Sequence, residues 1–168
     1  MSSGVALSVL QVFVVCVLVI VVVSSVFGNV LVCVAIFTER SLRKSSNYFY
    51  VSLAIADLLV AAVVMTFALA NDVMGYWMFG SVFCDIWLSS DVMCSTASIL
   101  NICAISMDRF LHIKDPYHYE TIMTSRRTLL VIGLIWLVSA LISFVPIHLD
   151  LHQTANHQAY VDGVFVCD

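Results

Sequence analysis

The sequence predicts an all-α membrane protein with four transmembrane helices, and three observations support that prediction. Hydrophobic residues make up 62% of the 168 residues and charged residues only 11%, whereas soluble domains are about 45–50% apolar and about 25% charged. Four long windows are nearly free of Asp, Glu, Lys and Arg, and each reaches the roughly 20 residues that cross a bilayer. The sequence shows none of the strand-length alternation that marks a membrane β-barrel.

The charge-poor windows give the order of the elements within a single transmembrane domain. Only Asp57 interrupts the second window and only Asp91 the third. Short polar connections join the windows, so neighbouring helices should run antiparallel. The first window lacks the basic start and cleavage site of a removable signal peptide, and we expect a retained helix there. The expected spans are approximately 8–37, 47–70, 84–109 and 128–148, followed by an outer-loop segment, 149–168.

The basic residues predict the orientation of the chain. Short connections rich in Lys and Arg mark the cytoplasmic side of a membrane. The N-terminus is therefore expected outside, in a multi-pass protein of the plasma membrane whose main partner is the lipid bilayer. The net charge of −4 reflects this topology and not an affinity for nucleic acid. The basic residues all lie in two connections: Arg40, Arg43, Lys44, Arg109, Lys114, Arg126 and Arg127.

Asp91 is the most informative carboxylate, because an ionisable residue inside a membrane usually marks a functional site. At about 100° per residue it shares one polar stripe of the third span with Cys84, Ser95, Ser98 and Arg109. Its place near the outer end predicts a pocket where it pairs with a small protonated amine. Aromatic rings would cover the apolar side of that amine. The alternative is a carboxyl that only hydrogen-bonds to a neighbouring helix.

Asp57 lies in the middle of the second span, near the level expected for Ser98 on the third. A carboxylate with hydroxyl oxygens suits a small hard cation such as sodium, and Asn29 on the first span is a candidate neighbour. The alternative is a polar contact that holds two helices together.

Cys84 and Cys167 are the cysteines expected on the outer side, where a disulfide can persist. We expect them to be bridged, with two free thiols at an interface as the alternative. Trp77, Phe79 and Trp87 are expected at the membrane interface. No metal site is predicted, because the sequence does not offer enough candidate ligands to complete a coordination sphere. The sequence also lacks the common catalytic motifs, so we do not expect an enzyme.

Five motifs occur in a fixed order along the chain: Gly28-Asn29-Val30, Leu53-Ala54-Ile55-Ala56-Asp57-Leu58, Trp77-Met78-Phe79-Gly80, Asp108-Arg109-Phe110 and Trp136. Together they resemble the rhodopsin-like G-protein-coupled receptors, over the whole chain. The resemblance implies the N-terminal part of a seven-helix bundle. On the residues alone, Asp108 and Arg109 can equally be ordinary charges that reach toward the interface.

Asp91, placed seven residues after Cys84, resembles the aminergic branch of that family. The stretches 91–101 and 143–147 are similar to dopamine receptors of the type-one class, and 112–116 to their invertebrate members. The resemblance therefore implies a receptor for a biogenic amine, dopamine first, that acts through a stimulatory G protein to raise cyclic AMP. Alternatives are an octopamine or beta-adrenergic-like receptor, a self-contained four-span membrane protein, or a truncated receptor product that does not signal.

The resemblance also implies a role for each matching residue. Asp91 would pair with the amine above a floor of Val92, Cys94 and Ser95. A polar network linked to an allosteric sodium ion would comprise Asn29, Asp57 and Ser98, and no other cofactor is implied. At the inner end Asp108 would hold Arg109 at rest and release it toward the heterotrimeric G protein. The residues assigned to coupling are Asp108, Arg109, Phe110, Pro116 and Tyr117.

Two positions depart from the family pattern. Phe110 replaces the usual tyrosine after Arg109, which removes a hydroxyl and keeps the ring. Thr66 stands where many amine receptors have proline, so we expect the outer kink of the second span to be absent.

Overall fold

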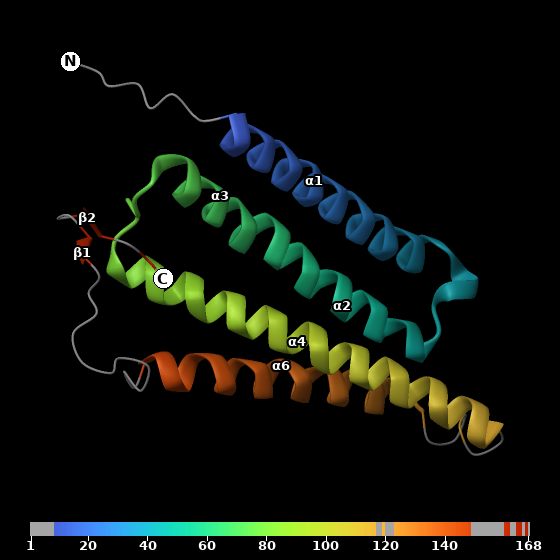
Figure 1. Ribbon diagram of the computed structural model, residues 1–168. Coiled ribbons are helices and arrows are strands. Elements are labelled where there is room, and N and C mark those ends of the chain that lie inside the picture. The colour runs from blue at the N-terminus through green and yellow to red at the C-terminus, as the bar shows by residue number, and fades with distance from the viewer. Residues whose placement is uncertain are drawn as a thin grey trace.

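The structure of the chain is a computed structural model that describes residues 9–116, 119, 123–148, 160–161, 164–165 and 167. Within those residues, four helical stretches are long and apolar enough to cross a membrane, as a multi-pass protein requires. They lie side by side, and successive stretches run in opposite directions (Figure 1). The elements are α1 (Val9–Thr38), η1 (Arg40–Leu42), η2 (Ser45–Asn47), α2 (Tyr48–Leu59), η3 (Val60–Val64), α3 (Met65–Met74), α4 (Ser81–Lys114), α6 (Ser125–His148), β1 (Tyr160–Val161) and β2 (Val164–Phe165).

The helices extend beyond several of the expected bounds. The expected range 84–109 is too short at both ends, since α4 runs from Ser81 to Lys114. The second span continues beyond residue 70, because α3 ends only at Met74, before Gly75 in the left-handed conformation with φ 74°. Charged residues mark the edge of the hydrocarbon, whereas a helix stops where its backbone hydrogen bonding is broken. Counting charges therefore locates the spans without fixing their ends.

The α4 helix lies in the middle of the bundle, packed against α2 on one side and α6 on the other, while α1 packs along α2, η3 and α3. Small residues allow these helices to approach closely. Ala56 and Ala97 are fully buried beside Ile135. The bundle is thus centred on the helix that carries Asp91.

Hydrogen bonds also join the helices across this interface. The Trp136 indole N–H donates to the Ser52 hydroxyl at 3.0 Å, and the Ser143 hydroxyl donates to the backbone carbonyl of Ser89. Both serines of the second bond are buried. Such bonds satisfy polar groups that have no water to bind inside a bilayer.

The second span is irregular although it lacks the proline. Its middle segment, η3, is a π-helix, in which hydrogen bonds reach one residue further than in an α-helix. Side chains fill the bonds that this leaves open: the Thr66 hydroxyl donates to the Ala61 carbonyl at 3.2 Å, and the Trp87 indole N–H donates to the Val64 carbonyl at 3.2 Å. From Thr66 we expected the second span to lack its outer kink. That expectation did not foresee the π-helical distortion at η3.

The outer segment after α6 adds a small feature to the predicted all-α fold. Strands β1 and β2 pair antiparallel, with Tyr160 opposite Phe165 and Val161 opposite Val164. In Figure 1 this hairpin lies at the same end of the bundle as the start of α4. It precedes Cys167, which the structure joins to that helix.

Candidate functional site

Asp91 is half-buried on α4 and has no Lys or Arg close to it. The Ser95 hydroxyl donates to its Oδ1 atom at 3.4 Å. The nearest basic residue along the helix is Arg109, about five helical turns further on. The remaining Lys and Arg residues lie at that same inner end, in η1, in the loop beside it, at the end of α4 or at the start of α6. No Lys or Arg of the chain is therefore placed to neutralise Asp91.

The other residues predicted for the amine pocket lie on different sides of α4. Ser95 contacts Asp91 directly, as their spacing of four residues predicts. Cys94 is 2% exposed, inside the bundle, whereas Val92 is 42% exposed. The structure thus groups Ser95 with Asp91 and places Val92 on an outward face.

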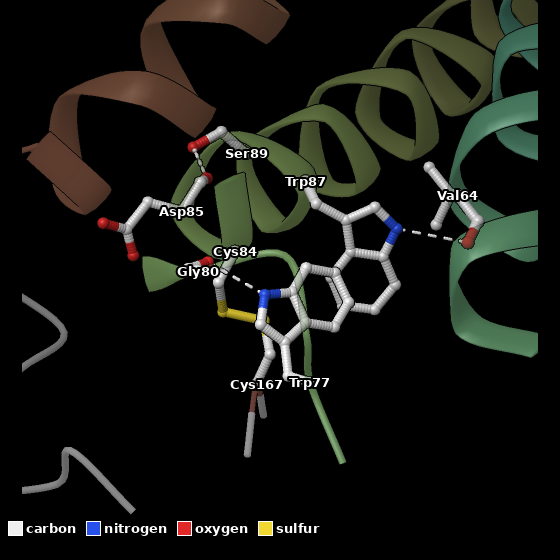
Figure 2. The surroundings of a disulfide bond; sticks show 8 residues. All are labelled: Val64, Trp77, Gly80, Cys84, Asp85, Trp87, Ser89 and Cys167. Atoms are coloured by element: carbon white, nitrogen blue, oxygen red, sulfur yellow. Dashed lines mark hydrogen bonds between the residues drawn. A yellow bond between two sulfur atoms is a disulfide. The ribbon is translucent and has the colours of Figure 1, made fainter. Parts of the chain in front are cut away.

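Aromatic rings lie on the outer side of Asp91, where Figure 2 shows two indoles against each other beside a disulfide. Trp87 precedes Asp91 by one helical turn and therefore shares its face of α4. Its ring centroid is 5.1 Å from that of Trp77, whose indole N–H donates to the Gly80 carbonyl at 2.9 Å. Three phenylalanines complete this aromatic cluster through ring contacts with Trp77 or with one another: Phe67, Phe79 and Phe83.

Trp77 does not have the exposed ring expected of a membrane-interface belt residue. Trp77 is 4% exposed and packs with both half-cystines of the disulfide in one buried cluster. A belt residue keeps one edge in the headgroup region, whereas here the disulfide and the neighbouring rings cover the indole. The prediction failed because the cover comes from residue 167, far along the chain.

The disulfide between Cys84 and Cys167 is confirmed. Their Cα atoms are 5.8 Å apart, which is within the ordinary range for a disulfide, and both residues are buried. The bond ties the outer segment to the first turn of α4, two turns before Asp91. The free cysteines of the described chain are Cys16, Cys33, Cys94 and Cys103.

Replacing Cys84 or Cys167 by serine is expected to lower the thermal stability of the protein markedly. The two residues are 83 positions apart, and closing a loop of that length stabilises a fold by about 4 kcal/mol in the chain-entropy picture. The measurement is the melting temperature of purified protein in detergent. Cys103→Ser, which removes an exposed thiol, is the matched control. Equal melting temperatures for all three variants would contradict the role of the bond.

Asp57 and Ser98 meet at mid-span, at the common level expected for them. The Ser98 hydroxyl donates to Asp57 Oδ1 at 2.9 Å, linking α2 to α4. Asn29 instead makes its hydrogen bonds within α1, where its amide donates to the Ser25 carbonyl at 3.0 Å and to the Ser25 hydroxyl at 3.4 Å. The structure therefore brings two members of the predicted polar network together and ties the third to its own helix.

The inner end of α4 places Asp108 and Arg109 in different surroundings. Asp108 is 3% exposed, and its Oδ1 atom accepts a hydrogen bond from the Tyr119 hydroxyl at 2.7 Å. Arg109 is exposed, donates to the Tyr50 hydroxyl at 3.2 Å, and lies 5.7 Å from the centre of that ring. The two charged neighbours thus hydrogen-bond to different tyrosines, one from the connection after α4 and one from α2.

Tyr119 is a functional candidate that the sequence patterns missed. Burial, together with the hydrogen bond to Asp108, raises the pKa of Tyr119 to about 12. The phenol is therefore protonated at neutral pH and donates to the buried carboxylate of Asp108. The sequence carries no pattern that would have identified this contact. Tyr119 follows Pro116 in the connection, and no periodicity relates it to Asp108.

Two of the other residues predicted for coupling lie near this site. Phe110 is 56% exposed on the last turns of α4, and the Lys114 ammonium lies 5.7 Å from the centre of its ring. Pro116 is exposed just beyond the helix. Tyr117 lies outside the described residues. Among the described residues, no group of three or more His, Cys, Asp or Glu side chains is arranged to hold a metal ion.

Comparison with known proteins identifies the family. The family described as "7 transmembrane receptor (rhodopsin family)" matches residues 28–168. Dopamine receptor 1 of Drosophila melanogaster is 58% identical over 139 residues, which are 83% of this chain and 27% of that receptor. The 5-hydroxytryptamine receptor 1 of Aplysia californica is 59% identical over 130 residues, 77% of this chain and 29% of that receptor.

A human relative gives the same result. The D(1B) dopamine receptor of Homo sapiens is 49% identical over 144 residues, 85% of this chain and 30% of that receptor. The chain thus spans about a third or less of the length of these curated relatives, all of which are receptors. Since the family match covers far more than half of the residues, the chain belongs to the rhodopsin family of seven-transmembrane receptors.

Proposed function

We propose that this chain is the N-terminal part of a plasma-membrane receptor for dopamine, with its N-terminus outside the cell. Asp91 carries the proposal. It is a half-buried carboxylate near the outer end of α4, and every Lys and Arg of the chain lies at the inner end. A buried charge without a protein partner needs a cation from elsewhere, and a protonated amine arriving from outside supplies one.

The surroundings of Asp91 fit an amine that carries an aromatic ring. Ser95 holds one carboxylate oxygen and leaves the other for the ammonium group. Trp87 lies one turn further out on the same face, where an indole stabilises a cation through its π face. The dopamine receptors of Drosophila melanogaster and Homo sapiens support dopamine as the ligand. The 5-hydroxytryptamine receptor supports serotonin as a second candidate, and Asp91 would bind either ammonium.

Asp57 and Ser98 form the second part of the proposal, an allosteric sodium site. The donors present are a carboxylate oxygen and a hydroxyl oxygen, which are the kind that small hard cations prefer. Asp57 has a second carboxylate oxygen that no described side chain is seen to occupy. Bound sodium would supply a positive charge in the middle of the bundle. Asp57 and Ser98 would hold it, with Asn29 recruited from α1.

Arg109 is the proposed coupling residue. Its guanidinium lies exposed at the inner end, while the adjacent carboxylate of Asp108 is occupied by Tyr119. We propose that Arg109 leaves Tyr50 and binds a stimulatory heterotrimeric G protein, which then raises cyclic AMP. Phe110, Pro116 and Tyr117 would form the surrounding docking surface.

The coding sequence beyond Asp168 tests whether the chain is part of a longer receptor. We expect an open reading frame with three further hydrophobic spans, because the relatives are more than three times as long as the segment that they share with this chain. An immediate stop codon would favour a truncated receptor product that does not signal.

A panel of amines tests the ligand and the coupling together. Dopamine, octopamine, tyramine and serotonin are applied to cells that express the full-length receptor, and cyclic AMP is measured. We expect dopamine to act at the lowest concentration. A lower effective concentration for serotonin or octopamine would reassign the ligand, whereas normal surface expression without any cyclic AMP rise would overturn the stimulatory coupling.

A further inference from the structure

Asn101 is a buried polar residue of α4 whose amide oxygen accepts no hydrogen bond from any described residue. The side chain is 0% exposed. Its amide N–H donates to the Ala97 carbonyl at 2.9 Å, one turn back on the same helix, so the oxygen at the other end of the amide is the unpaired atom. Nearly all buried polar atoms in folded proteins have a hydrogen-bond partner. The Asn101 oxygen therefore calls for a donor.

Ser52 on α2 has the complementary property, a hydroxyl proton without an acceptor. Its side chain is 4% exposed, and the hydrogen bond that it makes within the described residues is the one it accepts from the Trp136 N–H at 3.0 Å. Other helical serines of the bundle instead donate to the carbonyl four residues earlier, namely Ser89, Ser90, Ser106 and Ser139. Ser52 thus has a donor to offer where Asn101 has an acceptor.

The fold brings these two groups to one level of the bundle. Ala56 on α2 and Ala97 on α4 belong to the same buried cluster. Ser52 precedes Ala56 by one helical turn, and Asn101 follows Ala97 by one turn. Since α2 and α4 run in opposite directions (Figure 1), both steps lead toward the inner end. Trp136 packs against the same cluster, which brings α6 to this level as well.

The site suits a single water molecule. The hydroxyl of Ser52 and the amide oxygen of Asn101 lie at one level without a hydrogen bond between them. The neighbouring side chains Ala56, Ala97 and Ala104 are small. A buried water typically makes two to four hydrogen bonds to polar groups that lack other partners, and the hydrocarbon around the bundle supplies no water of its own.

We propose that a buried water molecule binds between α2 and α4, where it accepts the Ser52 hydroxyl proton and donates to Asn101 Oδ1. With the bond from Trp136 to Ser52, it completes a hydrogen-bonded chain from α6 through α2 to α4. The water thereby fixes the helix that carries Asp91 against its two neighbours. The proposal depends neither on the identity of the amine nor on the coupling partner.

A high-resolution structure of the purified full-length receptor tests the proposal directly. We expect a density peak within about 2.5–3.2 Å of both Asn101 Oδ1 and the Ser52 hydroxyl oxygen. A direct hydrogen bond between these two atoms would overturn the proposal. So would a site without density in a map that shows ordered waters elsewhere in the bundle.

Thermal stability tests the same point through the sign of a change. Leucine has nearly the shape of asparagine and lacks its polar atoms. Replacing an unpaired buried oxygen by an apolar group of that shape is neutral or stabilising, whereas removing a paired acceptor leaves its partners unsatisfied. We therefore expect Asn101→Leu to lower the melting temperature of the full-length receptor by about 2 °C or more. An equal or higher melting temperature would contradict the bound water.

A pair of substitutions separates the water bridge from a packing defect. Ser52→Ala removes the other end of the bridge, so Asn101→Leu should lower the melting temperature less than about half as much in that background. Ser139→Ala is the matched control, because Ser139 is also 0% exposed and its hydroxyl donates within its own helix at 2.7 Å. With this control the two effects should add.

Additive effects of Asn101→Leu and Ser52→Ala would show that Asn101 acts through packing alone and would overturn the proposal. Normal surface expression of the variants shows that they fold, and the density measurement on the unaltered receptor does not depend on them. A negative result in either measurement leaves the proposed amine site unaffected, because neither measures amine binding.

Discussion

Replacing Asp91 by asparagine in the full-length receptor is expected to weaken dopamine binding by about 100-fold or more. Asparagine keeps the size of the side chain and removes only its charge. Removing one partner of a desolvated ion pair costs about 3–5 kcal/mol, and about 1.4 kcal/mol corresponds to a tenfold change in affinity. All Lys and Arg residues lie at the opposite end of the bundle, so the amine is the cation expected to pair with Asp91, and asparagine cannot supply the charge for that pair.

Radioligand competition on cell membranes measures this effect, with surface expression determined in parallel. Asp85→Asn is the matched control, since Asp85 is a half-buried carboxylate on the same helix, near its outer end. In Figure 2 its carboxylate points away from the two indoles. We expect the control to retain normal affinity. Unchanged affinity in Asp91→Asn itself would remove the main support for an amine receptor.

Replacing Arg109 by alanine is expected to abolish the proposed dopamine-driven rise in cyclic AMP while leaving amine binding largely intact. Arg109 is about five helical turns from Asp91, so its loss should not disturb the amine pocket. In the structure its hydrogen bond goes to the neutral hydroxyl of Tyr50. A neutral partner holds a cation less firmly than a carboxylate does, which leaves Arg109 free to bind an incoming protein.

Cyclic AMP and radioligand affinity are measured together for this variant, because a folding defect would lower both. Arg126→Ala removes another exposed basic residue from the same end and should preserve the response. A full dopamine-driven response in Arg109→Ala would show that coupling does not depend on this residue.

The number and place of the spans were predictable because charges are too costly to bury in hydrocarbon. The same argument placed only Cys84 and Cys167 on the outer side and so predicted the bond between them. The contact of Ser98 with Asp57 was also accessible, since both lie near the middle of long, regular helices. These features depend on depth in the bilayer, which a sequence records directly.

Other contacts were not accessible in this way. The hydrogen bond from Tyr119 to Asp108 joins the connection between α4 and α6 to the end of α4, and Arg109 on α4 meets Tyr50 on α2 across 59 positions of sequence. Trp77 has the composition of a belt residue and is nevertheless buried by a distant half-cystine. For each of these contacts, neither periodicity nor hydropathy carries a signal that names the partner.

The π-helical segment η3 shifts the rotational phase of the second span. A π turn holds an additional residue compared with an α turn, so the side chains beyond Val64 are turned about the helix axis relative to a continuous α-helix. A helical wheel drawn straight through residues 48–74 therefore combines two faces that are out of phase. Asp57 lies on the inner side of this shift and Phe67 on the outer side. The lipid-facing and bundle-facing sides of the two halves have to be assigned separately.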